Sequence, residues 1–233
     1  MAKARGGSGV SSEAATPAAE WCTQPERSLP AGAVHVWGAD LGSGAARLRL
    51  LERNLSADER ARAARFRFAR DRERFIAARG LLRETLALYL DTAARQLSFG
   101  YGAHGKPFLA VPEHSGLRFN VSHSLDVVLV AVAHEREVGV DVEYVRSGLE
   151  VEAIAETVLS TPEKHALARF DGEPRRMAFL QFWTRKEAYV KADGRGVSSP
   201  LEHIDVSGPA DQVAVLDEAT GKWEARRCSH GAG

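Results

Sequence analysis

Cysteine is scarce in this sequence. The 233 residues include two, Cys22 and Cys228, which fall near opposite ends of the chain in poorly patterned segments. Cysteines in these places form neither a disulfide framework nor a cluster with metal-ligand spacing, which is typical of proteins in a reducing cytoplasm. We therefore expect a cytoplasmic protein without structural disulfide bonds.

Net charge and long apolar runs are also lacking. The 31 basic and 31 acidic side chains cancel, so the overall charge favours neither a nucleic acid nor an anionic membrane as a partner. No apolar run is long enough to span a bilayer. Residues 1–30 are rich in small and polar residues and have no continuous apolar stretch, so we interpret them as a disordered tail and not as a signal peptide.

The rest of the chain has the composition of a globular protein. With 44% hydrophobic residues, it is large enough for one large or two small domains with a real core. Order is predicted to begin with a short alternating strand at 34–37. Two helices should follow. A capping box of Ser56 and Glu59 opens the first, and the second is predicted from Arg70 to Leu90 with one apolar face.

Arginines are frequent on these two helices. Guanidinium groups match phosphate oxygens in bidentate geometry, so the helix pair is a candidate phosphate site. A solvated helix face is the alternative for each arginine taken alone. The arginines concerned are Arg60, Arg62, Arg65, Arg72, Arg74 and Arg79.

Short strands separated by polar turns are predicted in the middle of the chain. A turn-rich loop at 100–107 presents Lys106 at a rigid position. The strand-like runs that follow, a predicted antiparallel meander, are 118–122, 127–133 and 138–143. Where the first run ends, Ser122, His123 and Ser124 together offer three donors to an anion, although a lone histidine in such a place is more often structural.

The last of these runs carries two carboxylates. Strict alternation from Val138 to Glu143 places Asp141 and Glu143 on one face of the strand, within roughly 7 Å of each other. They repel unless something positive lies between them. Mg²⁺ takes one or two carboxylates and fills its shell with water and phosphate oxygens, so the pair is a candidate magnesium site. A solvated strand face is the alternative.

A later helix supplies a third carboxylate. It is predicted from about Arg175 to Ala192, with Gly194 as its stop. Glu187 and Lys191 lie four residues apart on one face. Taken alone they indicate a surface ion pair, which stabilises a helix by only ~0.2–0.5 kcal/mol. In combination with the two strand carboxylates, Glu187 becomes a candidate third metal ligand.

The second half of the sequence repeats the plan of the first. Ser160 and Glu163 open another helix, and after the long helix we predict strands at Val206 and at 213–216. The order strand, two helices and strands thus occurs twice, and the two parts divide near residues 134–137. This pattern favours an α+β fold.

Together these motifs resemble those of the 4′-phosphopantetheinyl transferases, of the larger, Sfp-like type in which one chain contains two similar α+β halves. Each motif alone has moderate or weak specificity, but five in the family's order and spacing are highly specific. The matching stretches are F-R-F at 66–68 with D-R-E-R-F at 71–75, G-K-P at 105–107, F-N-V-S-H-S at 119–124, G-V-D-V-E at 139–143 and W-T-R-K-E-A-Y-V-K at 183–191.

The resemblance implies a fold. The two halves would be related by pseudo-twofold symmetry, each a small, mainly antiparallel sheet with packed helices, and the active site would lie between them. The expected boundaries are 31–135 for the N-terminal half and 136–233 for the C-terminal half. Because members usually continue into one or two more strands where this chain has residues 228–233, we expect the second half to lack an edge strand.

The resemblance also implies a reaction. Such enzymes transfer the phosphopantetheine arm of coenzyme A to a serine of an apo acyl or peptidyl carrier protein and release adenosine 3′,5′-bisphosphate. Asp141, Glu143 and Glu187 would hold Mg²⁺, or Mn²⁺ in its place. Glu187 would be the general base, and Lys191 would meet the phosphates and assist the leaving group.

Further residues would bind coenzyme A by the same resemblance. Ser122, His123 and Lys106 would contact its phosphates, with His123 also counted among the catalytic groups. Arg62 and Arg74 are our choices for the ends of coenzyme A, with Arg60 and Arg65 as second choices. One chain with both halves is expected to act as a monomer.

Three other functions remain open from the sequence. A metal-dependent phosphohydrolase would use the same carboxylates without a protein acceptor. An arginine-rich nucleic-acid binder would need no metal, and the zero net charge disfavours it. An inactive member of the family would bind carrier proteins only, and the intact Asp141, Glu143, Glu187 and Lys191 disfavour that alternative.

Overall fold

The computed structural model describes most of the chain after the predicted tail. The described residues are 28–30, 32–42, 44–111, 115–146, 148–194, 200–208, 213–217 and 221–225. The tail predicted at 1–30 lies almost wholly outside them. The segment in which we expected a missing edge strand, 228–233, also lies outside them.

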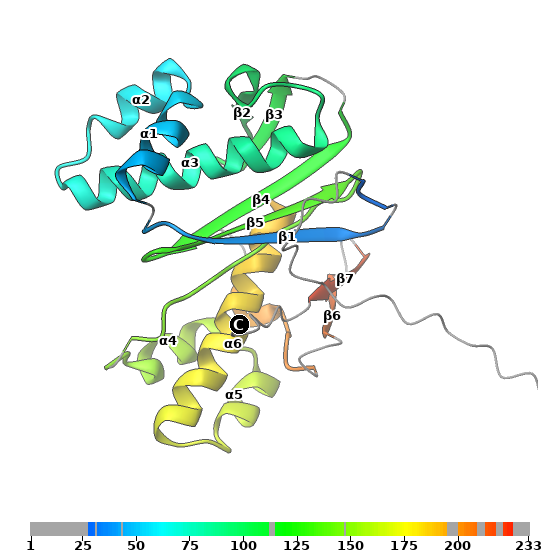
Figure 1. Ribbon diagram of the computed structural model, residues 1–233. Helices are drawn as coiled ribbons and strands as arrows, with labels where there is room; N and C mark the ends of the chain where they lie inside the picture. Colours follow the sequence, from blue (N-terminus) through cyan, green and yellow to red (C-terminus); the bar gives the residue numbers. More distant parts are fainter. Residues whose placement is uncertain are drawn as a thin grey trace, which may run out of the picture.

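A three-stranded antiparallel sheet lies at the centre of the molecule (Figure 1). Its strands are β1 (Val34–Asp40), β4 (Leu117–Ser124) and β5 (Val127–His134), in the order β1-β5-β4. The middle strand β5 is apolar at every position from 127 to 133. Such a continuous run is typical of a strand that is covered on both faces.

Three helices lie on one side of this sheet (Figure 1). They are α1 (Ala45–Arg53), α2 (Ala57–Ala63) and α3 (Ala69–Tyr89). Helices α1 and α3 share the core of the sheet, and α2 packs against α3. The capping box at the start of α2 is confirmed, because Ser56 Oγ accepts from Glu59 N and the Glu59 side chain accepts from Ser56 N. On α3, Leu82 and Leu86 are completely buried against the sheet, as their spacing predicted.

Two elements of the first half were not predicted. Helix α1 begins after Gly44, whose lack of a capping side chain leaves no start signal in the sequence. After a 3₁₀ turn η1 (Ala94–Gln96), the strands β2 (Ser98–Tyr101) and β3 (Pro107–Val111) form a hairpin around the predicted turn. The turn therefore projects from a rigid hairpin, and Lys106 lies at its end.

The C-terminal part is mainly helical and lies beyond the other face of the sheet (Figure 1). Its long helix α6 ends at Gly194, with a left-handed φ of 78°, as the sequence predicted. None of the described helices is long and apolar enough to cross a membrane. The elements are α4 (Val151–Val158), α5 (Thr161–Leu167), α6 (Gly172–Asp193), η3 (Leu201–His203) and a hairpin of β6 (Val213–Asp217) and β7 (Gly221–Ala225).

The strand predicted at 138–143 is not a strand, and this prediction was wrong. The segment is irregular because the N–H groups of Val140 and Val142 donate to side chains of β4, not to the backbone of a neighbouring strand. The alternation still orients its side chains, since Val138 and Val140 are buried against the sheet. The strand predicted at Val206 is also wrong, because Val206 N donates to the Glu163 side chain.

The irregular segment runs very close to α6. A Cβ atom built on Gly139 would lie 1.8 Å from the Ala188 carbonyl oxygen and 2.6 Å from Ala192 N. Real Cβ atoms do not approach other atoms so closely, so only glycine fits here. This contact brings the carboxylates of the segment beside the helix that carries Glu187 and Lys191.

The capping-box glutamate of α2, Glu59, also takes part in a network of buried ion pairs. Glu59 accepts from Arg79 at 2.5 Å and from Arg83 at 2.7 Å. Arg83, which is 1% exposed, also donates to the carbonyls of Ala94, the first residue of η1, and Leu97, which follows η1. We call Glu59, Arg79 and Arg83 the N-terminal network.

The capping-box glutamate of α5 has a matching network. Ser160 and Glu163 form the second predicted box, which is confirmed. Glu163 pairs with Lys186 of α6 at 2.8 Å, and both side chains are 0% exposed. Lys186 also donates to the carbonyls of Leu201, the first residue of η3, and Ile204, which follows η3. We call Glu163 and Lys186 the C-terminal network.

Candidate functional site

Asp141 and Lys191 meet where α6 passes the 138–143 segment. Lys191 Nζ donates to Asp141 Oδ1 at 2.5 Å and to Ser122 Oγ at 2.9 Å. Ser122 Oγ donates to the same oxygen of Asp141 at 2.9 Å. The Asp141 side chain is 4% exposed, and within the described part of the chain its Oδ2 atom is buried without a hydrogen-bond partner.

Glu187 lies in the field of the same groups. Burial raises the pKa of the Glu187 carboxyl, and the negative charges of Asp141 and Glu143 raise it further, while Lys191 offsets part of the shift. Glu187 is half-buried on α6, four residues before Lys191, so it shares the face of the helix from which Lys191 reaches Asp141.

Glu143 occupies the outer side of the cluster. Its Oε1 accepts from the indole Nε1 of Trp183 at 3.4 Å, and its Oε2 accepts from Ser124 Oγ at 3.4 Å. The sequence analysis placed Trp183 only in the apolar stripe of α6. It missed the polar contact, although Trp183 precedes Glu187 by four residues and so shares its face of the helix.

The donor set fits a hard divalent cation. No three His, Cys, Asp or Glu side chains are already grouped closely enough to hold a metal ion in the described ranges. However, a buried carboxylate oxygen of Asp141 lacks a partner among the described residues, and the pKa of Glu187 is raised by burial and then by neighbouring negative charge. A cation bound by carboxylate oxygens would remove both costs.

Lys106 lies at the C-terminal end of α6. Its Nζ donates to the Ala192 carbonyl at 2.6 Å and pairs with Glu137 Oε2 at 2.5 Å. A cation is favourable at a helix C-terminus, where carbonyl groups lack intrahelical partners. The β2–β3 turn is thereby fastened to the helix that carries Lys191.

The Ser-His-Ser motif does not present three donors to one side. It lies inside β4, whose alternation directs Ser122 and Ser124 toward the 138–144 segment. His123 pairs with Val128 and shares the α3 face of the sheet, where it is exposed. The prediction that these three residues act together on one anion is therefore corrected.

Arg74 lies at the same end of β4 as His123. Its Nε donates to Asp126 Oδ1 at 2.8 Å, in the turn between β4 and β5, and Arg70 donates to Asp126 Oδ2 at 2.9 Å. The Arg74 hydrogen bond is the main cause that lowers the pKa of Asp126 to about 2. Among the described residues, Arg74 Nη2 is buried without a hydrogen-bond partner, which leaves one donor for an anion.

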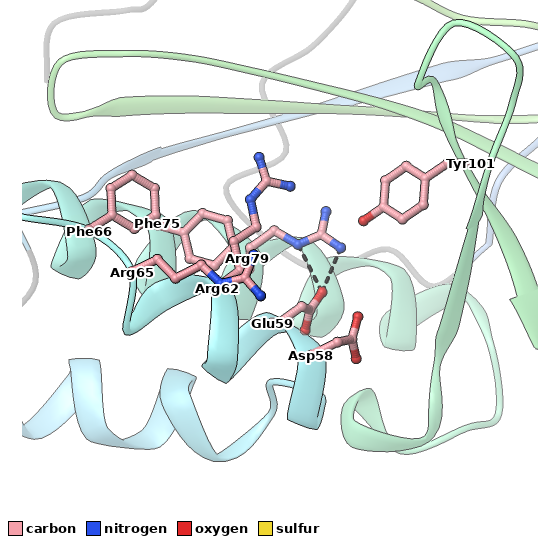
Figure 2. Close-up of a pocket in the computed structure, with 8 residues that line it drawn as sticks. All are labelled: Asp58, Glu59, Arg62, Arg65, Phe66, Phe75, Arg79 and Tyr101. Atoms are coloured by element: carbon pink, nitrogen blue, oxygen red, sulfur yellow. Dashed lines mark hydrogen bonds and ion pairs between the residues drawn. The ribbon is translucent and has the colours of Figure 1, made fainter.

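Arg62, Arg65 and Arg79 lie around a cleft of about 630 Å³ between α2, α3 and β2 (Figure 2). Arg62 and Arg65 line it, and the Arg62 guanidinium stands 5.3 Å from the centre of the Phe75 ring. Arg60 instead donates to the Leu55 carbonyl. The residues around the cleft are Asp58, Glu59, Arg62, Arg65, Phe66, Phe75, Arg79 and Tyr101.

Comparison with known proteins gives a consistent result. Residues 44–135 match a model described as the N-terminal region of 4′-phosphopantetheinyl transferase, and residues 137–231 match the 4′-phosphopantetheinyl transferase superfamily. The 4′-phosphopantetheinyl transferase HetI from Nostoc sp. is 38% identical over 196 residues, which cover 84% of this chain and 82% of that protein.

Two further relatives carry related names. A phosphopantetheinyl transferase from Thraustochytrium sp. is 31% identical over 91% of this chain and 78% of its own length. The 4′-phosphopantetheinyl transferase from Bacillus subtilis is 29% identical over 65% of this chain and 66% of its own length.

These similarities define an enzyme that transfers a phosphopantetheine group. The chain belongs to the 4′-phosphopantetheinyl transferase superfamily.

Proposed function

We propose that this enzyme transfers 4′-phosphopantetheine from coenzyme A to a serine hydroxyl of an apo acyl or peptidyl carrier protein. The other product is adenosine 3′,5′-bisphosphate. The observation that carries this proposal is the contact of Lys191 with the buried carboxylate of Asp141, one helical turn from Glu187. A reaction at a diphosphate needs compensation of negative charge and accurate positioning more than covalent help from the protein.

Asp141, Glu143 and Glu187 are proposed to hold Mg²⁺, for which Mn²⁺ is a chemical substitute. The unpartnered Oδ2 atom of Asp141 supports this assignment. When bound, the ion supplies positive charge to the diphosphate oxygens as negative charge grows on the leaving group.

Glu187 and Lys191 are proposed to move the protons. The acceptor serine loses its proton as its oxygen bonds to phosphorus, and Glu187 accepts that proton. The bond from phosphorus to the adenosine bisphosphate oxygen breaks. Lys191, 28% exposed, faces this leaving group and stabilises or protonates it.

Coenzyme A is proposed to cross the edge of β4. This strand has a neighbour on one side only within the central sheet, and its two faces carry Asp141 on one side and His123 with Arg74 on the other. A ligand that reaches both sets must pass around that edge. Lys106 would contact its phosphates, and the cleft that Arg62 and Arg65 line would take an anionic end of the molecule.

The domain plan follows from the same proposal. Two similar α+β halves, 31–135 and 136–233, would enclose the site, since Ser122 belongs to the first half and Asp141 and Lys191 belong to the second. The matched N-terminal and C-terminal networks support a pseudo-twofold relation between them. One chain then supplies every proposed group, so a monomer in the cytoplasm, where coenzyme A is available, is sufficient.

Mass spectrometry tests the function. Apo acyl and peptidyl carrier proteins are incubated with coenzyme A, Mg²⁺ and the enzyme, and we expect one serine to gain the mass of phosphopantetheine. Asp141→Asn should abolish the gain, whereas Lys164→Gln, which removes an exposed ion pair with Glu156, should leave it unchanged. Hydrolysis of coenzyme A without any carrier would instead support a phosphohydrolase.

A further inference from the structure

Three polar side chains at alternate positions of β4 hold the 138–144 segment against the sheet. Each accepts a hydrogen bond from a backbone N–H of the segment, and the acceptors and donors both advance by two residues. The bonds are Val140 N to Asn120 Oδ1 at 3.0 Å, Val142 N to Ser122 Oγ at 3.4 Å and Tyr144 N to Ser124 Oγ at 3.0 Å. We call Asn120, Ser122 and Ser124 the polar zipper.

The polar zipper determines where the carboxylates lie. An ordinary strand pair would place the segment at the edge of β4, but side-chain acceptors place it on the face of the sheet, next to α6. A shift of one residue would break all three hydrogen bonds and exchange the buried valines with Asp141 and Glu143. The zipper therefore fixes the register as well as the position.

The Ser122 hydroxyl is fully used inside the protein. A serine hydroxyl has one proton to donate and two lone pairs to accept with. Ser122 donates to Asp141 Oδ1 and accepts from Lys191 Nζ and Val142 N. The hydroxyl therefore has no proton left to donate to a phosphate oxygen. This finding argues against the phosphate contact that we expected for Ser122 from the sequence.

The same bonds leave one oxygen of Asp141 free. Ser122 and Lys191 both hold Oδ1, so Oδ2 is turned away from them and stays without a partner among the described residues. Ser124 repeats the arrangement with Glu143, because it donates to Oε2 of that carboxylate and accepts from the next backbone N–H. Each serine thus holds one carboxylate and its backbone together.

We propose that Asn120, Ser122 and Ser124 are positioning residues that hold Asp141 and Glu143 in place as cation ligands, and that Ser122 does not bind phosphate. The cation part of this inference rests on the proposed function. The zipper itself rests only on the described hydrogen bonds, so the two parts are tested by different measurements.

Hydrogen exchange of the full chain tests the zipper without metal or substrate. In Asn120→Ala and Ser122→Ala, peptides that cover 138–146 should exchange about tenfold faster, the effect of one lost hydrogen bond on local opening. Ser98→Ala, which removes an exposed hydroxyl on β2, is the matched control and should leave this region unchanged. Equal exchange in all variants would overturn the proposal.

Mn²⁺ binding without coenzyme A, followed by electron paramagnetic resonance, tests the positioning role. Loss of a residue that orients a metal ligand typically weakens metal affinity by about 10- to 100-fold, and we expect this range for Ser122→Ala. Ser122→Thr keeps the hydroxyl and should recover most of the affinity. Ser124→Ala, at a half-buried position, should show a similar but smaller loss and serves as the second variant if Ser122→Ala unfolds.

The alternative roles give different results. If Ser122 binds phosphate, Ser122→Ala keeps the Mn²⁺ affinity of the unaltered enzyme and raises KM for coenzyme A instead, which overturns the proposal. If the unaltered enzyme binds no Mn²⁺, the cation assignment of the proposed function fails, and positioning for a cation fails with it. Hydrogen exchange then decides the zipper alone.

Discussion

The N-terminal and C-terminal networks have the same local arrangement but different cationic residues. In each, a capping-box glutamate at the third position of a short helix pairs with a cation on the following long helix, and that cation also binds two carbonyls around a 3₁₀ turn. Glu59 has two arginine partners, and Arg79 remains 13% exposed. Glu163 has a single lysine partner, and both side chains are 0% exposed.

The pKa shifts reflect this difference. Burial raises the pKa of Glu59, but the hydrogen bonds and charges of Arg83 and Arg79 outweigh burial, so the net shift is downward. Burial lowers the pKa of Lys186, and Glu163 offsets only part of that effect. Two arginines on one carboxylate leave the N-terminal network with one positive charge in excess, whereas Glu163 and Lys186 balance each other.

The two networks therefore serve different purposes. The extra arginine of the N-terminal network faces the cleft in Figure 2, where an anionic ligand would meet it. The C-terminal network is completely buried, so it cannot contact a ligand. Lys186 directly precedes Glu187, however, and holds α6 to α5 and η3. The N-terminal network thus contributes a side chain to a cleft. The C-terminal network instead anchors α6, the helix that carries Glu187 and Lys191.

The largest expected effect is in the C-terminal network. Lys186→Met leaves Glu163 buried without its cation, and such a loss typically costs about 3–5 kcal/mol of unfolding free energy. Urea denaturation measures it. Lys164→Met, at the exposed pair with Glu156, is the matched control and should cost less than about 1 kcal/mol.

A second variant separates charge from packing. In Lys186→Met combined with Glu163→Gln, no unpaired charge remains, so about half of the lost stability should return. If the double variant is no more stable than Lys186→Met, packing around the lysine, and not its charge, fixes α6.

An intermediate effect is expected in the N-terminal network. Arg83→Met leaves Glu59 with Arg79, so the unfolding free energy should fall by about 2–3 kcal/mol, less than for Lys186→Met. The exposed pair of Arg47 with Glu84 provides the control variant Arg47→Met. A loss as large as that of Lys186→Met would show that Arg79 gives no compensation, and the contrast between the networks would disappear.

The sequence predicts the local parts of these networks but not their long-range pairs. Ser56 with Glu59 and Ser160 with Glu163 lie three residues apart, so a capping box is recognisable in one dimension. Their cations follow 20 or more residues later, and their identity depends on how the helices pack. No periodicity distinguishes Lys186 from the exposed Lys164.

The site was predicted in part for the same reason. Charge repulsion between Asp141 and Glu143 is visible in a D-x-E pattern, and α6 has a clear apolar period. Alternation alone does not show whether backbone N–H groups find a strand or side chains as partners, so 138–143 was assigned to the sheet. The end of β4 was set at Ser122, two residues too early, which hid the opposite directions of Ser122 and His123.

Replacing Arg79 should affect stability less than Arg83→Met does. Its main effect should be on the binding of coenzyme A. Arg79→Gln leaves the Glu59–Arg83 pair intact, so the unfolding free energy should fall by about 1 kcal/mol. Because Arg79 also faces the cleft, KM for coenzyme A should rise about fivefold to tenfold with kcat little changed. Steady-state kinetics with an apo carrier measures both constants. An unchanged KM would show that the cleft does not contribute to coenzyme A binding.

The smallest effect is expected at an ion pair outside both networks. Asp126, which Arg74 and Arg70 hold near the surface, has its pKa lowered from 3.8 to about 2, first by the Arg74 hydrogen bond. Because the folded pKa is the lower one, its stabilising effect is complete above pH 3.8 and is lost as the pH falls through about 2. Asp126→Asn should lower the melting temperature by about 2 °C or less near neutral pH.

The difference between Asp126→Asn and the unaltered enzyme should then shrink as the pH approaches 2, because the protonated aspartic acid no longer attracts either arginine. Calorimetric scans of Asp126→Asn and of the unaltered enzyme between about pH 2 and 6 measure this convergence. The two melting temperatures are compared at each pH where both proteins are folded. A difference that stays constant down to the lowest pH would mean that the carboxylate acts by hydrogen bonding alone. The cost of Asp126→Asn would then come from the loss of one oxygen acceptor for Arg74 or Arg70, because the amide NH2 group of asparagine cannot accept a hydrogen bond.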